Sequence, residues 1–231
     1  MNDLLQKTIA DVVSDDISTA SIFKKYNLDF CCGGGITVEK ACEKNNIDAS
    51  SLISDLNAVK SSNSAPDLNF KDWDATFLID YIVNVHHKYV TENSDIIYEF
   101  SQKVATVHGE HSPEVIRIAE LVEKMVADLQ PHMMKEERVL FPAIKELVAN
   151  KGASFPFGSI NNPISMMEDE HEQVGEFAKE IITLSNNFQA PDWACNTYKA
   201  LYFKLDEFIN DLFQHIHLEN NILFKKVKAL S

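Results

Sequence analysis

Hydrophobic residues recur every three or four positions through most of the chain after residue 70, which is the pattern of amphipathic α-helices. Four long segments show this pattern, and residues that start or stop helices flank them. The expected helices span about residues 73–108, 112–150, 162–187 and 192–231. No segment shows the apolar–polar alternation of a β-strand. Long helices joined by short connections predict an all-α fold, a bundle of four helices running up, down, up and down.

Proline and glycine mark the ends of these helices. Ser112 and Pro113 pair an N-cap residue with a proline suited to the first helical turn. Gly109 is placed to follow the first helix as a C′ glycine. Pro131 and Pro142 lie inside the second segment, so we expect a kink or a break there rather than one straight rod.

The first 58 residues have a different organisation from the rest of the chain. Their short amphipathic segments predict a compact helical unit and span about residues 18–26, 38–44 and 49–59. Residues 60–66 read Lys-Ser-Ser-Asn-Ser-Ala-Pro, which is the composition of a linker. We therefore predict a small helical domain at residues 1–58, a linker at 59–71 and the four-helix bundle at 72–231.

Histidine and glutamate occupy positions on the hydrophobic faces of the last three expected helices. The motif His-x-x-x-Glu occurs twice, at His132 and Glu136 and again at His215 and Glu219, and this spacing puts both side chains on one helix face. His171 holds a similar position in the third helix. The three stripes are Met125, Leu129, His132, Glu136, Val139 and Ala143; Ile164, Met167, His171, Val174, Ala178 and Ile181; and Leu201, Leu205, Phe208, Leu212, His215, Glu219 and Ile222.

A single His-x-x-x-Glu pair is most often a solvated pair on an acidic helix. Its repetition inside apolar stripes argues against that reading, because burying an ionised carboxylate costs several kcal/mol unless a cation or hydrogen bonds compensate. In the first helix the apolar spacing slightly favours His86, with Ile79 and Ile82, over His87. Imidazole and carboxylate groups that converge between helices suit a non-haem iron site. We read the remaining histidines as solvent-facing: His108, His111 and His217.

Composition and charge narrow the function classes. The chain has 231 residues, of which 45% are hydrophobic, and a net charge of −14, which argues against nucleic acid or an anionic membrane as a partner. The N-terminus lacks a signal-peptide pattern, and no uncharged run approaches the ~20 residues that cross a bilayer. The four cysteines give no disulfide framework. We therefore expect a soluble, cytoplasmic protein.

Two adjacent cysteines, Cys31 and Cys32, come directly before the glycine cluster Gly33–Gly35. A helix is expected to follow, and thiols just before a helix N-terminus can have lowered pKa values and act as nucleophiles or metal ligands. The alternative is a tight turn that carries two ordinary cysteines. A disulfide between these neighbours would be strained, so thiol chemistry is the catalytic role we assign to them as a hypothesis. Cys42 and Cys195 are expected to pack in the core of amphipathic helices.

Four phrases of the chain are similar to a known protein family. They read His132-Met-Met-Lys-Glu-Glu-Arg-Val-Leu-Phe-Pro142, Met167-Glu-Asp-Glu-His171, His215-Ile-His-Leu-Glu-Asn-Asn-Ile-Leu-Phe224 and Lys25-Tyr-Asn-Leu-Asp-Phe-Cys-Cys-Gly-Gly34. The first three resemble the hemerythrin-like domain of the RIC (repair of iron centres) di-iron proteins. The last resembles the ScdA-type N-terminal domain of the same family, so that the resemblance covers nearly the whole chain.

The resemblance implies a non-haem di-iron centre, with two iron ions per chain held by four histidines and two bridging glutamates. Matched position by position, the implied metal ligands are His87, His132, Glu136, His171, His215 and Glu219. The match selects His87 and overrides the preference for His86 that the apolar spacing gave. It also implies a stress-response role in iron–sulfur cluster repair after nitrosative or oxidative damage, with damaged iron–sulfur proteins as partners.

The third helix departs from the pattern of oxygen-carrying hemerythrins, whose third helix supplies two histidines four residues apart. Here Gly175 follows four residues after His171, so one nitrogen ligand is missing and an iron ion should keep an open position. Such a position suits nitric oxide, O₂ or peroxide, or release of the metal. A di-iron enzyme that reduces NO or peroxide, and an O₂ or NO sensor or carrier, are therefore rival readings. A homodimer is one candidate assembly.

Overall fold

The computed structural model describes residues 2–62 and 68–230. Within these residues the regular structure is helical, and the extended pairings are two isolated bridges, Thr8 with Thr37 and Phe155 with Gly158. This confirms the all-α prediction. By its internal contacts the chain divides into two compact units, one made of residues 1–78 and 213–231 and the other of residues 79–212.

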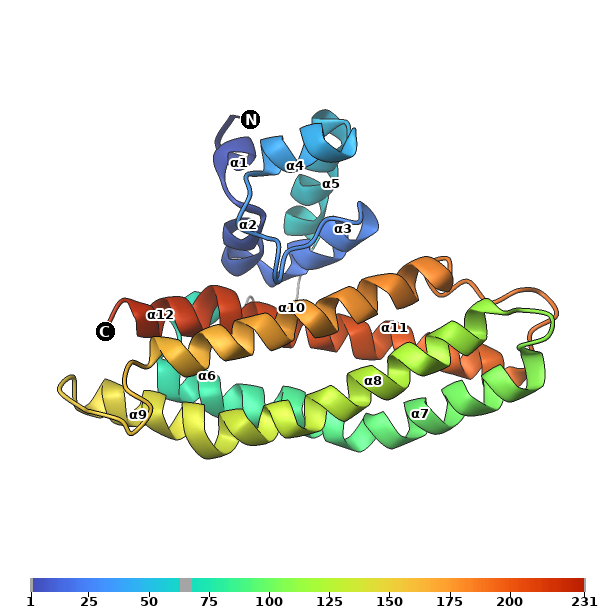
Figure 1. The fold of residues 1–231 in the computed structure, drawn as a ribbon. Coiled ribbons are helices and arrows are strands. Elements are labelled where there is room, and N and C mark those ends of the chain that lie inside the picture. The colour runs from blue at the N-terminus through green and yellow to red at the C-terminus, as the bar shows by residue number, and fades with distance from the viewer. Residues whose placement is uncertain (1, 63–67, 231) are drawn as a thin grey trace. The chain divides into compact units, whose positions relative to one another are not determined.

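Long helices packed side by side as a bundle form the second unit (Figure 1). They are α7 (Lys88–His108), α8 (Glu114–Lys135), α10 (Asn161–Leu184) and, up to residue 212, α11 (Asn196–His217), with the shorter α9 (Phe141–Ala149) following α8. Helix α8 packs against both α7 and α10. The predicted four-helix bundle is confirmed, although α11 begins at Asn196 rather than near residue 192.

Three π-helical segments interrupt the long helices in the described residues. They are η3 (Ile82–His87) between α6 (Ala75–Tyr81) and α7, η4 (Glu136–Leu140) between α8 and α9, and η5 (Leu218–Leu223) between α11 and α12 (Phe224–Lys228). A π-helical turn holds more residues than an α-helical turn, so it changes which positions face the core. Val139, which we expected in a buried stripe, is 47% exposed, and Leu140 is buried instead. The other two predicted stripes are buried throughout.

Helix ends lie near the predicted positions, but two of the predicted caps are absent. Helix α8 begins at Glu114, with Pro113 rather than Ser112 at its N-cap and with no side-chain cap hydrogen bond. Pro131 lies inside α8, and the expected break falls at η4, after which Pro142 stands in the first turn of α9. Gly109 follows α7 but has φ −61°, so it is not a left-handed cap. A Cβ at Gly109 would lie 2.8 Å from Ile116 Cγ1, which shows that close packing is what requires glycine there.

Short helices around a small core form the N-terminal part of the first unit. They are α1 (Asn2–Gln6), α2 (Ile9–Asp15), η1 (Ile17–Thr19), α3 (Ala20–Lys25), α4 (Val38–Asn45) and α5 (Ala49–Ser62). The side chains of Val12, Phe23, Leu52 and Leu56 are fully buried there. Helices α1 and α2 were not expected, because each is too short to show a helical period. The Asp48 side chain accepts hydrogen bonds from the first turn of α5.

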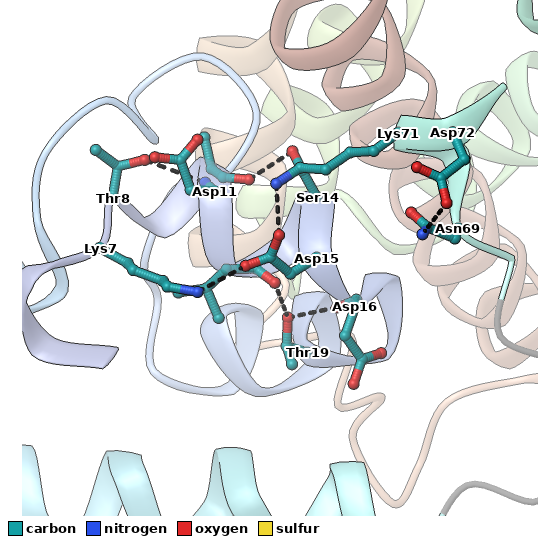
Figure 2. A network of polar contacts seen from close by, with 12 residues as sticks. Lys7, Thr8, Asp11, Ser14, Asp15, Asp16, Thr19, Asn69, Lys71 and Asp72 are labelled. Carbon is teal, nitrogen blue, oxygen red and sulfur yellow. Dashed lines mark hydrogen bonds and ion pairs between the residues drawn. The ribbon is translucent and has the colours of Figure 1, made fainter. Parts of the chain in front are cut away.

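Charged contacts join α2 to η2 (Phe70–Asp72), the first element described after residue 67. Asp15 of α2 accepts from Lys7 Nζ at 3.0 Å and from Lys71 Nζ at 2.5 Å (Figure 2). Burial acts to raise the pKa of the Asp15 carboxyl, but the two lysines outweigh it and lower this pKa. Residues 63–67 of the predicted linker lie outside the described residues, and the division into residues 1–58 and 72–231 stays a prediction.

In the described part of the chain, no helix combines the length and the hydrophobicity that a membrane-spanning helix needs.

Candidate metal centre

The second unit brings four of the predicted ligands into its interior. His87 ends η3, His132 lies in the last turn of α8, Glu136 opens η4 and His171 lies midway along α10. Each is at most 3% exposed. Glu136 Oε2 lies 3.4 Å from His87 Nε2 and 3.3 Å from His132 Nε2, and the Nε2 atoms of His132 and His171 are 3.0 Å apart. Glu136 therefore stands between two imidazoles, as a bridging carboxylate would.

The first unit contributes the second His-x-x-x-Glu motif. His215 lies at the end of α11 and Glu219 at the start of η5, so that one helical turn separates them. His215 Nε2 is 3.1 Å from Glu219 Oε1, and both side chains are buried. The spacing that the sequence predicted thus places this imidazole and this carboxylate together on a buried face.

The predicted ligands form two groups whose potential ligand atoms all lie within 4.8 Å of one another. One group is His87, Glu136, His215 and Glu219, and the other is His132, Glu136, His171 and Glu219. Glu136 and Glu219 belong to both groups. Two metal ions that share two carboxylates would use this arrangement, with imidazole nitrogens as the remaining protein ligands.

Outer carboxylates fix the orientation of two of these imidazoles. His87 Nδ1 is 2.8 Å from Glu137 Oε1, and His132 Nδ1 is 2.8 Å from Glu170 Oε2. A carboxylate accepts hydrogen bonds, so each Nδ1 carries the proton and each Nε2 presents its lone pair. Both lone pairs then face the Glu136 carboxylate, and a cation bound between them would stabilise this arrangement of electron-rich atoms. The donor set therefore fits a metal ion.

The Glu170 carboxylate is itself held in place. Lys135 donates a hydrogen bond to Glu170 Oε1, while His132 occupies Oε2. Burial acts to raise the pKa of Glu170, but the contacts with Lys135 and His132 lower it overall, which keeps this carboxyl ionised. An ionised Glu170 strengthens the basicity of His132 as a ligand.

Sequence reasoning missed these outer carboxylates. Glu137 and Glu170 each stand next to a predicted ligand in the chain, which is the one sequence signal that points to them. Each supports an imidazole from another helical segment: Glu137 of η4 supports His87, and Glu170 of α10 supports His132. Such pairings between helices do not follow from the period of one helix.

The π-helical segment η3 explains why the apolar spacing did not distinguish His86 from His87. Ile79 and Ile82 are buried before the end of η3, whereas Val90 and Ile97 continue the buried face after it. The two phases differ because the π-turn inserts a residue between them. Both histidines are buried as a result, but only His87 belongs to one of the two groups.

The imidazole of His86 has a different environment. His86 Nδ1 is 2.9 Å from Asp211 Oδ1, and the ring stands edge-on to Tyr81. Asp211 is a third carboxylate, beside Glu137 and Glu170, that holds a histidine of this region and that the sequence did not single out.

The cysteine pair differs from the expectation. Cys31 is buried and Cys32 half-buried, with their Sγ atoms 3.8 Å apart, and Cys31 Sγ lies 3.3 Å from Asp29 Oδ1. The hydrogen bond to Cys32, burial and the negative charge of Asp29 raise the pKa of the Cys31 thiol well above its usual range. The expected lowering was wrong for Cys31, because α4 begins only at Val38 and a carboxylate is the nearer charge.

Two other expectations need correction. His217 was expected to face solvent but is fully buried, because residues of the N-terminal helices cover it: its Nε2 lies 3.2 Å from Ser14 Oγ. This burial lowers the pKa of His217 to about 4. Cys195 was expected in the core but is exposed, since it precedes α11, and its Sγ lies 3.2 Å from Nε2 of the half-buried His108. Cys42 is buried and His111 exposed, as expected.

Removal of an outer carboxylate should weaken metal binding without abolishing it. We expect Glu170→Ala and Glu137→Ala each to lower metal affinity by about 10- to 100-fold, because the supported imidazole loses its orientation and some basicity. Competition with a chromophoric chelator measures this affinity. Glu172→Ala is the matched control, since Glu172 is an exposed glutamate of α10. Equal affinities for all three variants would contradict the assigned role.

Comparisons with known proteins agree with this geometry. Residues 78–227 match the model of the hemerythrin HHE cation binding domain, and residues 5–60 match ScdA_N, which is described as a domain of unknown function. A probable iron-sulfur cluster repair protein of Haemophilus influenzae is 36% identical, with 96% of each chain covered. The iron-sulfur cluster repair protein YtfE of Musicola paradisiaca is also 36% identical, again over 96% of each chain. ScdA of Staphylococcus haemolyticus, which has the same descriptive name, is 32% identical over 96% of this chain and 97% of its own.

The matches cover both parts of the chain and both halves of the buried cluster. The two groups that share Glu136 and Glu219 have the form typical of a hemerythrin di-iron site. The chain therefore belongs to the hemerythrin HHE family, in the group of two-part proteins whose members are named iron–sulfur cluster repair proteins.

Proposed function

We propose that this chain takes part in the repair of iron–sulfur clusters damaged by nitrosative or oxidative stress, and that it uses a non-haem di-iron centre to do so. The observation that carries the proposal is the pair of buried groups sharing two glutamates, in a chain that repair proteins match over 96% of its length. Its proposed ligands are His87, His132, Glu136, His171, His215 and Glu219. Damaged iron–sulfur proteins are the proposed macromolecular partners, in the cytoplasm.

The protein side chains have distinct tasks in this proposal. Glu136 and Glu219 hold two ions side by side, since each belongs to both groups. Glu137 and Glu170 keep the imidazoles of His87 and His132 turned toward the centre. A di-iron centre, when bound, supplies one-electron chemistry and coordination positions for small molecules. Burial of the ligands limits the access of bulk water to these positions.

Gly175 supports a reactive or labile centre rather than a reversible carrier. It lies on the buried face of α10, one turn after His171. A glycine there contributes neither a nitrogen ligand nor a side chain that would fill the space beside the ion. We propose that NO, O₂ or peroxide can use this space, or that an ion can leave through it.

The same observation favours one second candidate function, a di-iron enzyme that reduces NO or peroxide. An open coordination position serves turnover of a small molecule as well as it serves release of iron. An O₂ or NO carrier or sensor is less well supported, because the position four residues after His171 supplies no ligand.

We propose that the thiols of Cys31 and Cys32, in the domain formed by residues 1–58, act in repair. The two candidate functions therefore predict different effects of removing these thiols. The double variant Cys31→Ser, Cys32→Ser should keep its iron and its reaction with NO but restore a purified, NO-damaged [4Fe–4S] enzyme several-fold more slowly. Cys195→Ser is the matched control, because Cys195 is an exposed thiol that lies outside both metal groups. Recovery of client activity, N₂O and iron release are followed together under anaerobic conditions. Wild-type repair by the double variant, together with catalytic N₂O formation, would favour the enzyme instead.

A further inference from the structure

The backbone of the cysteine loop is held by side chains of the C-terminal helical stretch, within the first unit. Asn221 Nδ2 donates to the carbonyl oxygen of Cys31 at 2.9 Å and lies 3.3 Å from that of Phe30. The Phe30 ring stands edge-on to the ring of His217, with centroids 5.8 Å apart, and to Phe213 at 6.2 Å. Polar and aromatic contacts therefore both join this loop to α11 and η5.

Hydrogen-bond chemistry determines how His217 takes part. The Ser14 hydroxyl donates to the carbonyl oxygen of Ala10 at 2.7 Å, and its oxygen lies 3.2 Å from His217 Nε2. His217 Nδ1 lies 3.2 Å from Asn221 Nδ2 and 3.3 Å from the carbonyl oxygen of Phe30, and the tautomer of His217 decides which of these contacts are hydrogen bonds. Asn221 Nδ2 is therefore within hydrogen-bond distance of both His217 and the Cys31 carbonyl. Ser14 lies on α2 (Figure 2) and is the other end of this series of polar contacts.

Two i, i+4 pairs interleave along this helical stretch. His217 and Asn221 hold the cysteine loop, while His215 and Glu219 belong to the metal groups. An offset of two residues corresponds to a rotation of about 200° around a helix, so the two pairs point in different directions from the same turns. Asn221 and Glu219 both lie in the π-helical segment η5. A change in the winding of η5 would move both of them.

Metal binding should affect that winding. A π-turn is less favourable than an α-turn and persists where surrounding interactions require it. Without metal, the buried carboxylate of Glu219 loses the cation that compensates its charge. The segment that carries Glu219 is then the part of the helix with most to gain from rearrangement.

We infer that His217 and Asn221 are positioning residues that couple the metal centre to the cysteine pair: metal bound by Glu219 and His215 stabilises η5, and η5 holds Cys31 in its buried position. Loss of metal loosens the contact of Asn221 with the loop and exposes the Cys31 thiol. Since coupling between two sites is reciprocal in direction, covalent modification that holds Cys31 exposed weakens metal binding. The inference rests on the proposed metal ligands. It makes the accessibility of the Cys31 thiol depend on whether metal is bound.

Alkylation of individual cysteines tests this coupling in the full chain. Protein loaded anaerobically with Fe(II), and protein stripped by a chelator, are treated with iodoacetamide, and the rate at each cysteine is measured by mass spectrometry. We expect Cys31 to react about tenfold faster without metal, a size typical of coupling between sites. Cys42 is the internal control, because it is a buried thiol on α4 of the same unit, and its rate should not change.

Variants separate the coupling from the metal site itself. Asn221→Ala should make Cys31 react fast with or without metal while about two iron ions remain bound, and Ser14→Ala should have a smaller effect in the same direction. Equal Cys31 rates with and without bound metal in the wild type, or an unchanged rate in iron-loaded Asn221→Ala, would overturn the coupling and leave the proposed function standing. A wild-type chain that binds no metal would overturn both.

Discussion

Replacing either shared glutamate, by Glu136→Ala or Glu219→Ala, should remove most of the iron from both metal positions. Each of these carboxylates belongs to both groups, so either replacement takes a ligand from two ions at once. His171→Ala should be milder and leave about one ion per chain, because His171 belongs to one group only. Iron per chain after anaerobic loading and gel filtration measures the difference, with about two ions expected in the wild type, one for each group.

The neighbouring histidines of η3 provide a matched control for this experiment. His86 and His87 are both buried, but His87 alone belongs to a group. We expect His87→Ala to lose iron and His86→Ala to retain about two ions. Retention by His87→Ala, or a milder loss in the glutamate variants than in His171→Ala, would contradict the ligand assignment.

Removal of the metal should lower the stability of the wild type by about 4 kcal/mol or more. A ligand that binds only the folded state at 1,000 times its dissociation constant stabilises it by about that amount. The buried carboxylates of Glu136 and Glu219 account for part of this cost, because their charges lose the compensating cation. Urea unfolding with and without a chelator measures the difference in the free energy of unfolding.

The variant Glu219→Ala shows the origin of that stability change. It should unfold at nearly the same urea concentration with and without a chelator. In the metal-free state it should be about as stable as the metal-free wild type, since the alanine removes a buried charge that has lost its cation. A much less stable metal-free variant would indicate that Glu219 and His215, 3.1 Å apart, form a structural ion pair instead.

Helical periodicity predicted most of the fold and much of the site. The stripes around His171 and His215 are buried throughout: the first lies wholly within α10, and the second continues through Glu219 and Ile222 of η5. At the other two π-turns the period fails: Val139 is exposed, and the spacing of apolar residues around η3 does not identify His87. A π-turn depends on tertiary contacts and leaves no regular pattern in the sequence.

Other parts of the site depend on contacts between segments that are far apart in the chain. The supporting roles of Glu137 and Glu170 come from helix packing, and the burial of His217 comes from Ser14 and Phe30, about 200 residues earlier in the chain. Periodicity within a helix contains no information about such partners. At one position the resemblance to a family made a choice that periodicity did not make: it selected His87 over His86, and of these two only His87 belongs to a metal group.

The central claim is tested most directly by comparing two proteins, the wild type and a variant without the metal centre, in the repair of a damaged cluster. A purified [4Fe–4S] enzyme is inactivated with NO, freed of excess NO, and incubated anaerobically with iron-loaded wild type or with the double variant Glu136→Ala, Glu219→Ala at equal total iron. The account predicts that the wild type restores the client's activity and that the variant restores no more than free Fe(II) does. Equal recovery with both proteins would show that the buried histidine–glutamate centre is not what repairs the cluster.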